Sequence, residues 1–260
     1  MKVVWFGTAS ILIEDEDVRV LFDPYLKLHN PSLPPFPLDD IGDVKAIFIT
    51  HPHLDHFADM QTVMEHCPAP VFVCARGMEI AQEQGFDMTR MYRIDAGDAM
   101  QIGGLTVHAW RSRHCEYDRP VVRETLSRAL KPSHLREGLS VDRQNHLFRI
   151  DMQRDVLAFE VSSAQRSVFL LGSANCCDDV DYPKRMDLLV YPYQGRSDME
   201  TYSMQFLDRF SPRCVMLDHF DDAFPPVSSQ MDCAPFLERV RQRCPGMKIF
   251  EPRELAVYEV

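Results

Sequence analysis

The sequence predicts an α/β fold, and three observations support this prediction. Short apolar runs typical of β-strands recur along the whole chain, and segments with helix-like spacing of apolar residues separate several of them. Glycine or proline stands near the ends of many of these runs, as expected where strands and helices stop. The 260 residues are 45% hydrophobic and 26% charged, the balance of a globular protein with a sizeable core. We expect one domain over residues 1–260, since α/β folds of this length often form a single unit.

The N-terminal third is predicted to begin with strands joined by tight turns. These strands cover residues 2–7, 10–14 and 18–22. The acidic run Asp15-Glu16-Asp17 is the expected turn between the last two, and Asp23-Pro24 ends the pattern. Residues 28–38 contain four prolines and little periodicity, so we expect an irregular surface loop there.

The middle of the chain alternates further strands with helices. Strands are predicted over residues 45–50, 71–74, 91–94, 99–102 and 105–110. Helices are predicted over residues 57–66 and 76–84. Pro68 follows the first helix, and Gly85 stands at the C-terminal end of the second. This alternation is typical of an α/β protein.

Residues 116–145 break the alternation and are predicted to form a partly helical insertion. The segment is polar and rich in arginine, and its helix is expected over residues 121–130, between Pro120 and Pro132. We expect this insertion to act as a lid. Strands then resume over residues 146–150, 156–161, 167–171, 188–191, 214–217, 248–250 and 255–259, with helices over 199–210 and 233–243.

Charge and cysteine usage limit the classes of protein that the chain can represent. The formal net charge of -11 argues against binding to nucleic acid or to an anionic membrane. It therefore also argues against a nuclease. No apolar run approaches the length of a membrane span, and residues 1–7 are expected to form a strand rather than a targeting segment. The eight cysteines include no Cys-x-x-Cys pair and are expected to be reduced thiols, which favours a cytoplasmic location.

The run Thr50-His51-Pro52-His53-Leu54-Asp55-His56 predicts a metal site. It follows the apolar stretch 46–49, so imidazole and carboxylate groups gather at the end of a strand. Histidine nitrogen and aspartate oxygen suit zinc, manganese or iron, whereas three histidines would be poor core residues because each ring needs a polar partner. A solvated surface loop is the alternative interpretation.

Two distant histidines share this structural position. His114 follows the strand predicted over 105–110, and His219 follows the strand over 214–217. Loops at strand ends are where α/β proteins place ligands and catalytic groups. Either histidine alone would more often be a surface or core residue, but their common position favours convergence with the run 50–56.

The motif His51-x-His53-x-Asp55-His56 resembles the metallo-β-lactamase superfamily, whose signature is His-x-His-x-Asp-His between a strand and a helix. The opening segment, which leads into Asp23-Pro24, is also similar to the start of that family. The closest resemblance is to cytosolic metal-dependent hydrolases of the branch that includes ascorbate-phosphate lactonases. The resemblance implies a four-layered αβ/βα sandwich with two metals at one edge of the paired sheets.

The resemblance also implies the ligands. His51, His53 and His114 would hold the first metal, and Asp55, His56 and His219 would hold the second, with Asp55 and His219 as the expected catalytic residues. Asp23 would orient a ligand imidazole through its other ring nitrogen. We expect one or two divalent ions, with zinc as the first choice and manganese or iron as alternatives.

One position departs from the family pattern. Relatives usually carry an aspartate that bridges both metals after the strand that corresponds to residues 168–171, but this chain has Ser173 there. A neutral hydroxyl cannot neutralise two dications as a carboxylate does. Three outcomes stay open: one metal only, two metals bridged by hydroxide alone, or compensation by a nearby side chain. The candidates for compensation are Asn175, Cys176, Asp178 and Asp179.

The expected function is that of a metal-dependent hydrolase in which a metal-bound hydroxide attacks an ester, lactone or phosphoester of a small molecule. Between residues 111 and 143 there are eight Lys or Arg against five Asp or Glu, which favours an anionic substrate if the insertion covers the site. A surface helix with no such role is the alternative for that charge. The alternative function is a non-catalytic metal- or ligand-binding member of the same fold, which lost the bridging carboxylate at Ser173.

Overall fold

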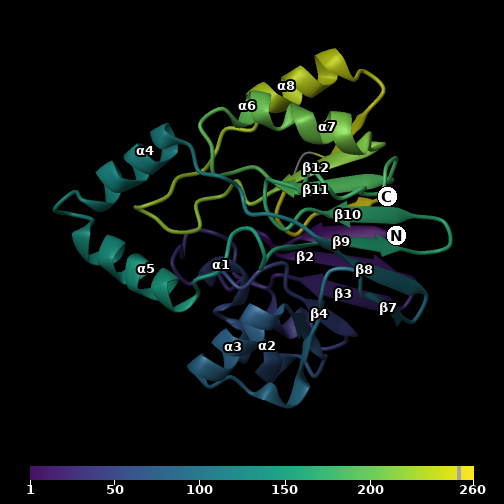
Figure 1. Ribbon diagram of the computed structural model, residues 1–260, viewed down its shortest axis with the longest axis horizontal. Helices are drawn as coiled ribbons and strands as arrows, with labels where there is room; N and C mark the ends of the chain where they lie inside the picture. The colour runs from purple at the N-terminus through teal and green to yellow at the C-terminus, as the bar shows by residue number, and fades with distance from the viewer. Residues whose placement is uncertain (251–252) are drawn as a thin grey trace.

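Two seven-stranded sheets lie face to face, and helices cover their outer faces (Figure 1). The computed structural model describes residues 1–250 and 253–260. Helices α2 and α3 lie outside one sheet, and α6, α7 and α8 lie outside the other. This arrangement is a four-layered αβ/βα sandwich, so the predicted fold class is confirmed.

The first sheet is built from the N-terminal part of the chain and one C-terminal strand. Its order is β14-β1-β2-β3-β4-β5-β6, antiparallel from β14 to β3 and parallel from β3 to β6. Its strands are β1 (Lys2–Trp5), β2 (Ile11–Asp15), β3 (Val18–Phe22), β4 (Ala46–Phe48), β5 (Val71–Val73), β6 (Met91–Arg93) and β14 (Val257–Glu259). Its helices are α1 (Leu54–Phe57), α2 (Met60–His66) and α3 (Ala75–Gln84).

The second sheet is built from the remaining strands in the order β13-β12-β11-β10-β9-β8-β7. Its strands are β7 (Ala99–Ile102), β8 (Leu105–Arg111), β9 (Leu157–Ser162), β10 (Ser167–Leu170), β11 (Leu188–Pro192), β12 (Cys214–Asp218) and β13 (Lys248–Phe250). The helices outside it are α6 (Met199–Tyr202), α7 (Met204–Phe210) and α8 (Ala234–Arg243). Strands β10 to β13 are parallel, so their carboxyl ends meet at one edge.

The main core lies between the two sheets. Phe22 and Phe48 of the first sheet each place their ring centroid 5.5 Å from that of Phe159 in the second, and all three side chains are fully buried. Aromatic contacts of this kind add to the burial energy that holds the two sheets together. The edge of the sandwich that carries the candidate ligands is therefore supported by a rigid core.

Most predicted elements are found with their ends shifted by up to two residues, but the strand predicted over residues 146–150 is wrong. The helix α5 (Leu135–Leu147) runs into this segment. Phe148 is buried and anchors the end of the helix, whereas Leu147 is exposed. The apolar residues here therefore mark the attachment of a helix to the body and not the alternation of a strand.

Two predicted helices are each divided in two. The helix predicted over residues 57–66 starts at the last residue of α1 and continues as α2, and the break between them includes Asp59, whose carboxylate accepts a hydrogen bond from the backbone of Leu26 at 2.8 Å. The helix predicted over residues 199–210 is α6 followed by α7, with the buried Ser203 between them. Local apolar spacing indicates the helices but not these tertiary breaks.

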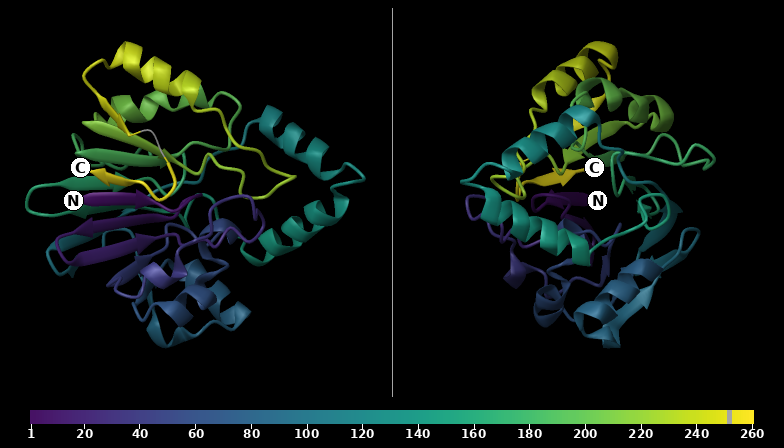
Figure 2. Two further views of the ribbon diagram at one scale, coloured as in Figure 1. Left: turned by 180° about the vertical axis from the view of Figure 1, so that it is seen from behind. Right: turned by 60° about the vertical axis from the view of Figure 1, so that its left-hand side comes forward.

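The insertion forms a helical hairpin that projects from the sandwich (Figures 1 and 2). Its first helix, α4 (Arg119–Ala129), agrees with the predicted one, and the side chain of Asp118 caps it by accepting a hydrogen bond from Val121 N at 2.9 Å. The second helix, α5, was not predicted. In the described part of the chain, no helix combines the length and the apolar character that a membrane span requires.

Candidate metal centre

The six candidate ligands come from connections that follow three strands of the sandwich. The segment after β4 carries four of them, and the segments after β8 and β12 carry one each. The ligands are His51, His53, Asp55, His56, His114 and His219. The structure therefore brings together every residue that the sequence predicts for the two metals.

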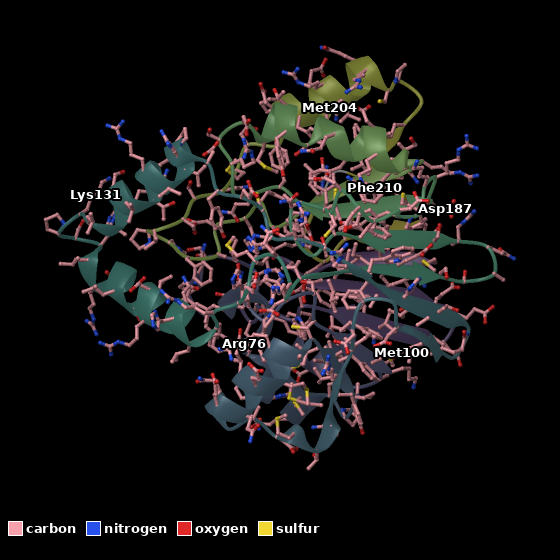
Figure 3. All side chains as sticks on the ribbon, viewed as in Figure 1. Arg76, Met100, Lys131, Asp187, Met204 and Phe210 are labelled. Carbon is pink, nitrogen blue, oxygen red and sulfur yellow. The ribbon has the colours of Figure 1, made fainter. Side chains whose placement is uncertain are left out.

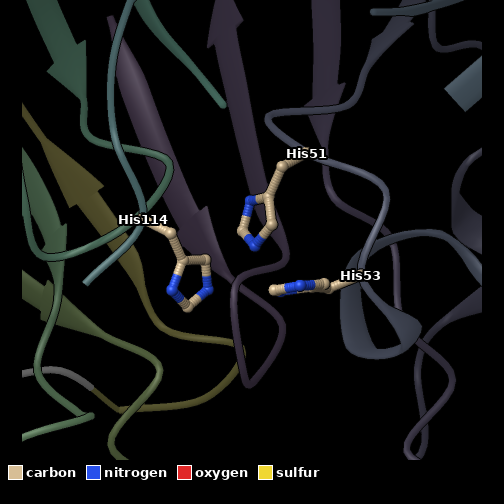
Figure 4. Close-up of side chains that lie close together, drawn as sticks. All are labelled: His51, His53 and His114. Atoms are coloured by element: carbon tan, nitrogen blue, oxygen red, sulfur yellow. The ribbon is translucent and has the colours of Figure 1, made fainter. Parts of the chain in front are cut away.

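The first group consists of three imidazoles. The ligand atoms of His51, His53 and His114 all lie within 4.8 Å of one another, and the three rings point toward a common space (Figure 4). His51 and His114 are buried, and His53 is half-buried. Three imidazole nitrogens are the protein ligands of many catalytic zinc sites.

The second group contains one carboxylate and two imidazoles. Asp55, His56 and His219 also offer ligand atoms within 4.8 Å of one another. Nε2 of His219 lies 3.0 Å from Oδ2 of Asp55, and Nε2 of His56 lies 3.9 Å from Oδ1. The rings of His51 and His56 are 4.0 Å apart between centroids, so the two groups adjoin each other.

Asp23 and Thr50 orient one imidazole from each group. Oδ2 of Asp23 accepts hydrogen bonds from Nδ1 of His56 at 2.9 Å and from the hydroxyl of Thr50 at 2.6 Å. Because that hydroxyl donates its hydrogen to Asp23, it can accept one from Nδ1 of His51, which is 3.0 Å away. Both imidazoles then carry their hydrogen on Nδ1 and keep the Nε2 lone pair free. Asp23 thus has the position that the resemblance implies.

Two further imidazoles are oriented in the same way. Nδ1 of His114 lies 3.0 Å from the backbone oxygen of Cys115, and Nδ1 of His219 lies 2.9 Å from Oε1 of Gln194. Each acceptor holds a hydrogen on Nδ1, which leaves Nε2 of His114 free, whereas Nε2 of His219 contacts the carboxylate of Asp55. Four of the five imidazoles are therefore held in one tautomer by partners outside the two groups.

The first group fits a divalent metal ion. Nε2 of His51 is buried and has no hydrogen-bond partner, an arrangement that is costly for a polar atom unless a ligand satisfies it. Burial is the main cause that lowers the pKa of His53 to about 3 and that of His114 to about 4, and it also holds the pKa of His51 well below its usual value. Neutral imidazoles with free lone pairs are the form that binds a metal.

The second group carries charge. Burial opposes ionisation of Asp55, but the imidazoles of His56 and His219 outweigh it and lower the pKa of the carboxyl. Burial likewise opposes the charged form of His219, yet the hydrogen bond to Asp55 raises its pKa to about 9. The carboxylate is therefore ready to bind a cation, and a metal would compete there with a proton.

Ser173 does not stand in for a bridging carboxylate. Its hydroxyl oxygen accepts a hydrogen bond from the backbone of Cys115 at 2.9 Å. The side chain of Asn175 donates to the backbone oxygen of His114 at 3.0 Å. Both side chains thus hold the loop that carries His114.

The other residues considered for compensation are also engaged elsewhere. Asp178 pairs with Arg209 at 3.5 Å, and Asp179 pairs with Arg111 at 2.6 Å. Burial raises the pKa of Cys176, which disfavours a thiolate ligand. Within residues 1–250 and 253–260, neither group of ligands includes any of these three.

Sequence reasoning missed two contacts that hold His219. The backbone of His219 donates to the backbone oxygen of Thr8 at 2.7 Å, and Oδ2 of Asp221 accepts hydrogen bonds from the backbone and hydroxyl of Thr8. Both residues have a left-handed backbone conformation, with φ 47° at Thr8 and φ 54° at His219. This conformation is unusual for a β-branched residue such as Thr8. Gln194 is the other partner, and only its place directly after a strand could have indicated it.

Several residues that the sequence places near the site have other contacts. Asp221 and Asp222, which follow His219 in the chain, accept hydrogen bonds from Thr8 and Ser228 respectively. Asp218 is buried, and burial raises its pKa well above the usual range. The ring of Tyr193 is buried against Phe236, and Arg196 pairs with Asp198 at 2.8 Å.

Comparisons with known proteins agree with this geometry. Residues 18–220 match the family described as the beta-lactamase superfamily domain. A UPF0173 protein of Pyrococcus furiosus is 31% identical over 114 residues, which is 44% of this chain and 50% of the relative. A UPF0173 metal-dependent hydrolase of Herpetosiphon aurantiacus is 29% identical over 113 residues, covering 43% and 46%. The chain thus spans about half the length of the curated relatives it matches.

Solved structures share the fold over the whole chain. Igni18, a metallo hydrolase from Ignicoccus hospitalis, has a TM-score of 0.64 at 16% identity and covers 100% of this chain and 98% of its own. At this identity the likeness speaks for the fold alone. The match to the family extends from β3 to the segment after β12 and includes all six candidate ligands. The chain therefore belongs to the metallo-β-lactamase superfamily.

Proposed function

We propose that this protein is a metal-dependent hydrolase of small molecules. The observation that carries the proposal is the fixed set of Nδ1 hydrogen bonds, which leaves the Nε2 atoms of His51, His56 and His114 available to a metal in two adjoining groups, while Nε2 of His219 contacts the carboxylate of Asp55. When bound, divalent metal ions supply an activated water and polarise the scissile bond. Relatives named metal-dependent hydrolases support the same reaction class.

Each group has its own part in holding the ions. His51, His53 and His114 would hold the first ion through three neutral nitrogens, for which zinc is the favoured metal. Asp55 and His219, expected to be catalytic, would hold the second ion together with His56. Two imidazoles and one carboxylate also suit iron or manganese, so the second group is the one in which these alternatives are open.

The non-catalytic alternative rests on Ser173. Its hydroxyl is engaged by the backbone of Cys115, and a serine at this position supplies no carboxylate to join the two groups. A member of the fold that binds one ion and no longer hydrolyses its ligand would have these features. We favour the hydrolase because both groups keep all of their ligands and the residues that orient them.

The substrate class follows from the same considerations. We propose an ester, lactone or phosphoester of a small molecule, with no nucleic acid or membrane as partner, because the chain has a net charge of -11. The eight cysteines are free thiols, which supports a cytoplasmic location.

Metal analysis and a substrate panel test the proposal. The protein is purified without chelator, its zinc, manganese and iron are measured, and carboxylic esters, lactones and phosphodiesters are then assayed. We expect the protein to contain stoichiometric metal. Hydrolysis should stop when a chelator removes the metal and should return when zinc is added. Metal without any turnover across the panel would support the non-catalytic alternative, and the absence of stoichiometric metal would reject both.

A further inference from the structure

A shallow cavity of about 340 Å³, open to solvent, lies on the projecting hairpin beside the metal centre. It is lined by Tyr117, Arg119, Val122, Arg123 and Leu126. Its volume is at the lower end of the range of small-molecule sites. None of these residues is a candidate metal ligand, and the cavity therefore needs an explanation of its own.

One part of the lining is apolar and exposed to solvent. Tyr117 is 53% exposed, Val122 43% and Leu126 54%. Val122 and Leu126 are four residues apart in α4, so they lie on the same face of the helix. Apolar side chains that gather at a concave surface mark a place where an apolar group binds.

The other part of the lining is cationic. Arg119 and Arg123 are also four residues apart, and within residues 1–250 and 253–260 neither has an acidic partner. Arg128 of the same helix differs, because it pairs with Glu124 at 2.5 Å and donates to the backbone oxygen of Ser228 at 3.0 Å. Figure 3 shows nitrogen-tipped side chains extending from this hairpin, with Lys131 at its turn. Two unpaired arginines in a chain of net charge -11 are suited to an anion.

Contacts with the sandwich hold the cavity next to the metal centre. The ring of Tyr117 lies 5.6 Å from that of His114 between centroids. Asp118 accepts hydrogen bonds from the backbone and hydroxyl of Ser197 at 2.8 and 2.6 Å. A side chain at Gly195 would approach Tyr117 to 3.4 Å, so the tyrosine packs closely on that loop. Tyr117 thus connects the cavity to the ligands of the first group.

We propose that this cavity binds the anionic, amphiphilic part of the substrate. An apolar chain would lie against Tyr117, Val122 and Leu126, and a carboxylate or phosphate would pair with Arg119 and Arg123. The scissile bond would then extend past Tyr117 toward His114. This inference rests on the proposed function, because it names the substrate class of the same site.

Binding of simple probes to the full-length, metal-free protein tests the inference without requiring turnover. Octanoate, octanol and acetate are compared by titration calorimetry. We expect octanoate to bind at least about tenfold more tightly than either probe, because only octanoate engages both the arginines and the apolar residues. The double variant R119Q/R123Q is expected to weaken octanoate by about tenfold and to leave octanol unchanged.

A matched control removes the same charge from the neighbouring helix. R136Q/R143Q alters two arginines of α5 that do not line the cavity, and it is expected to change octanoate binding by less than about twofold. L126S is expected to weaken octanoate and leave acetate unchanged. Equal weakening by the two double variants would overturn the proposal, since it would indicate only a general effect of charge.

Further outcomes distinguish this proposal from other occupants and from the proposed function. Equal affinity for octanol and octanoate, or no detectable octanoate binding, would also overturn it. A dimer in sedimentation that L126S dissociates, with octanoate binding unchanged, would assign the face to a second copy of the chain. Octanoate binding in a protein that hydrolyses none of the carboxylic esters, lactones and phosphodiesters would retain the cavity's role in binding and reject only the hydrolase.

Discussion

The two ligand groups differ in charge, although they adjoin each other and have Asp23 as a common support. The first consists of three neutral imidazoles, and burial lowers the pKa of each; they are His51, His53 and His114. The second contains the single carboxylate, that of Asp55, together with His219, whose pKa is raised to about 9. From this difference we predict that the two sites load separately, because the chain has Ser173 at the position where the resemblance implies a bridging carboxylate.

The support for the two groups also differs. Nδ1 of His51 is held by Thr50, and Nδ1 of His219 is held by Gln194. Asp23 connects the groups, since it accepts hydrogen bonds from both Thr50 and His56. Substitution of Thr50 or Gln194, each of which orients an imidazole of one group, should therefore weaken metal binding mainly in that group. Substitution of a ligand itself should have a larger effect.

The largest effect is expected for His114→Ala. Loss of one of three imidazoles should lower the affinity of the first group for zinc by on the order of a thousandfold and abolish hydrolysis. Equilibrium dialysis with metal analysis measures the zinc, and the second group should keep its ion. His146→Ala, on the exposed part of α5, is the control and should behave as the unmodified protein. Loss of all bound metal in His114→Ala would contradict separate loading.

Asp55→Asn should act on the other group. Removal of its only carboxylate is expected to weaken the second ion by on the order of a hundredfold, because charge dominates attraction of a dication there. A competitive zinc titration with a chromophoric chelator checks this result. Asp59→Asn, which changes a carboxyl outside both groups, is the matched control. An equal loss from the first group would show that the two ions depend on each other.

Substitution of Gln194 or Thr50, which each orient one imidazole, is expected to lower metal affinity by an intermediate amount. Gln194→Leu should weaken only the second ion, by roughly 10- to 100-fold, since His219 loses the acceptor for its Nδ1 hydrogen. Thr50→Val should act mainly on the first ion through His51. The same titration measures both variants, and Gln205→Leu on the surface is the control. If both variants weakened the same ion, the assignment of partners to groups would be wrong.

Ser173→Asp should have the smallest effect and the opposite sign. A carboxylate at this position is expected to raise the affinity for the second ion by about tenfold, while it can still accept the hydrogen bond from Cys115. Ser173→Asn, of similar size and without charge, should not raise it. Unchanged metal affinity in Ser173→Asp would mean that this side chain does not reach the two groups.

The sequence predicts the parts of the fold and the site that depend on local pattern. The run from His51 to His56 stands directly after an apolar strand, and such a run can be interpreted without knowing the rest of the fold. The prediction of a strand over 146–150 is wrong because the apolar side chain of Phe148 does not belong to a strand. It is buried at the end of α5, where it packs against the body of the protein. Local alternation cannot separate these two causes.

The missed contacts join residues that are distant in the sequence. The hydroxyl of Ser173 meets the backbone of Cys115, and Gln194 meets His219. Neither pair has a spacing or composition that marks it, since a single hydrogen bond leaves no periodic pattern. The absence of a bridging aspartate could be predicted, but the use that the fold makes of Ser173 required the structure.

Anomalous diffraction from crystals soaked in zinc tests the central claim most directly. The account predicts one peak bounded by the Nε2 atoms of His51 and His114 together with His53, and a second peak between Asp55, His56 and His219. The peaks should fill separately as the zinc concentration rises, the order showing which group binds more tightly. Zinc bound elsewhere on the protein, with neither group occupied, would contradict the account.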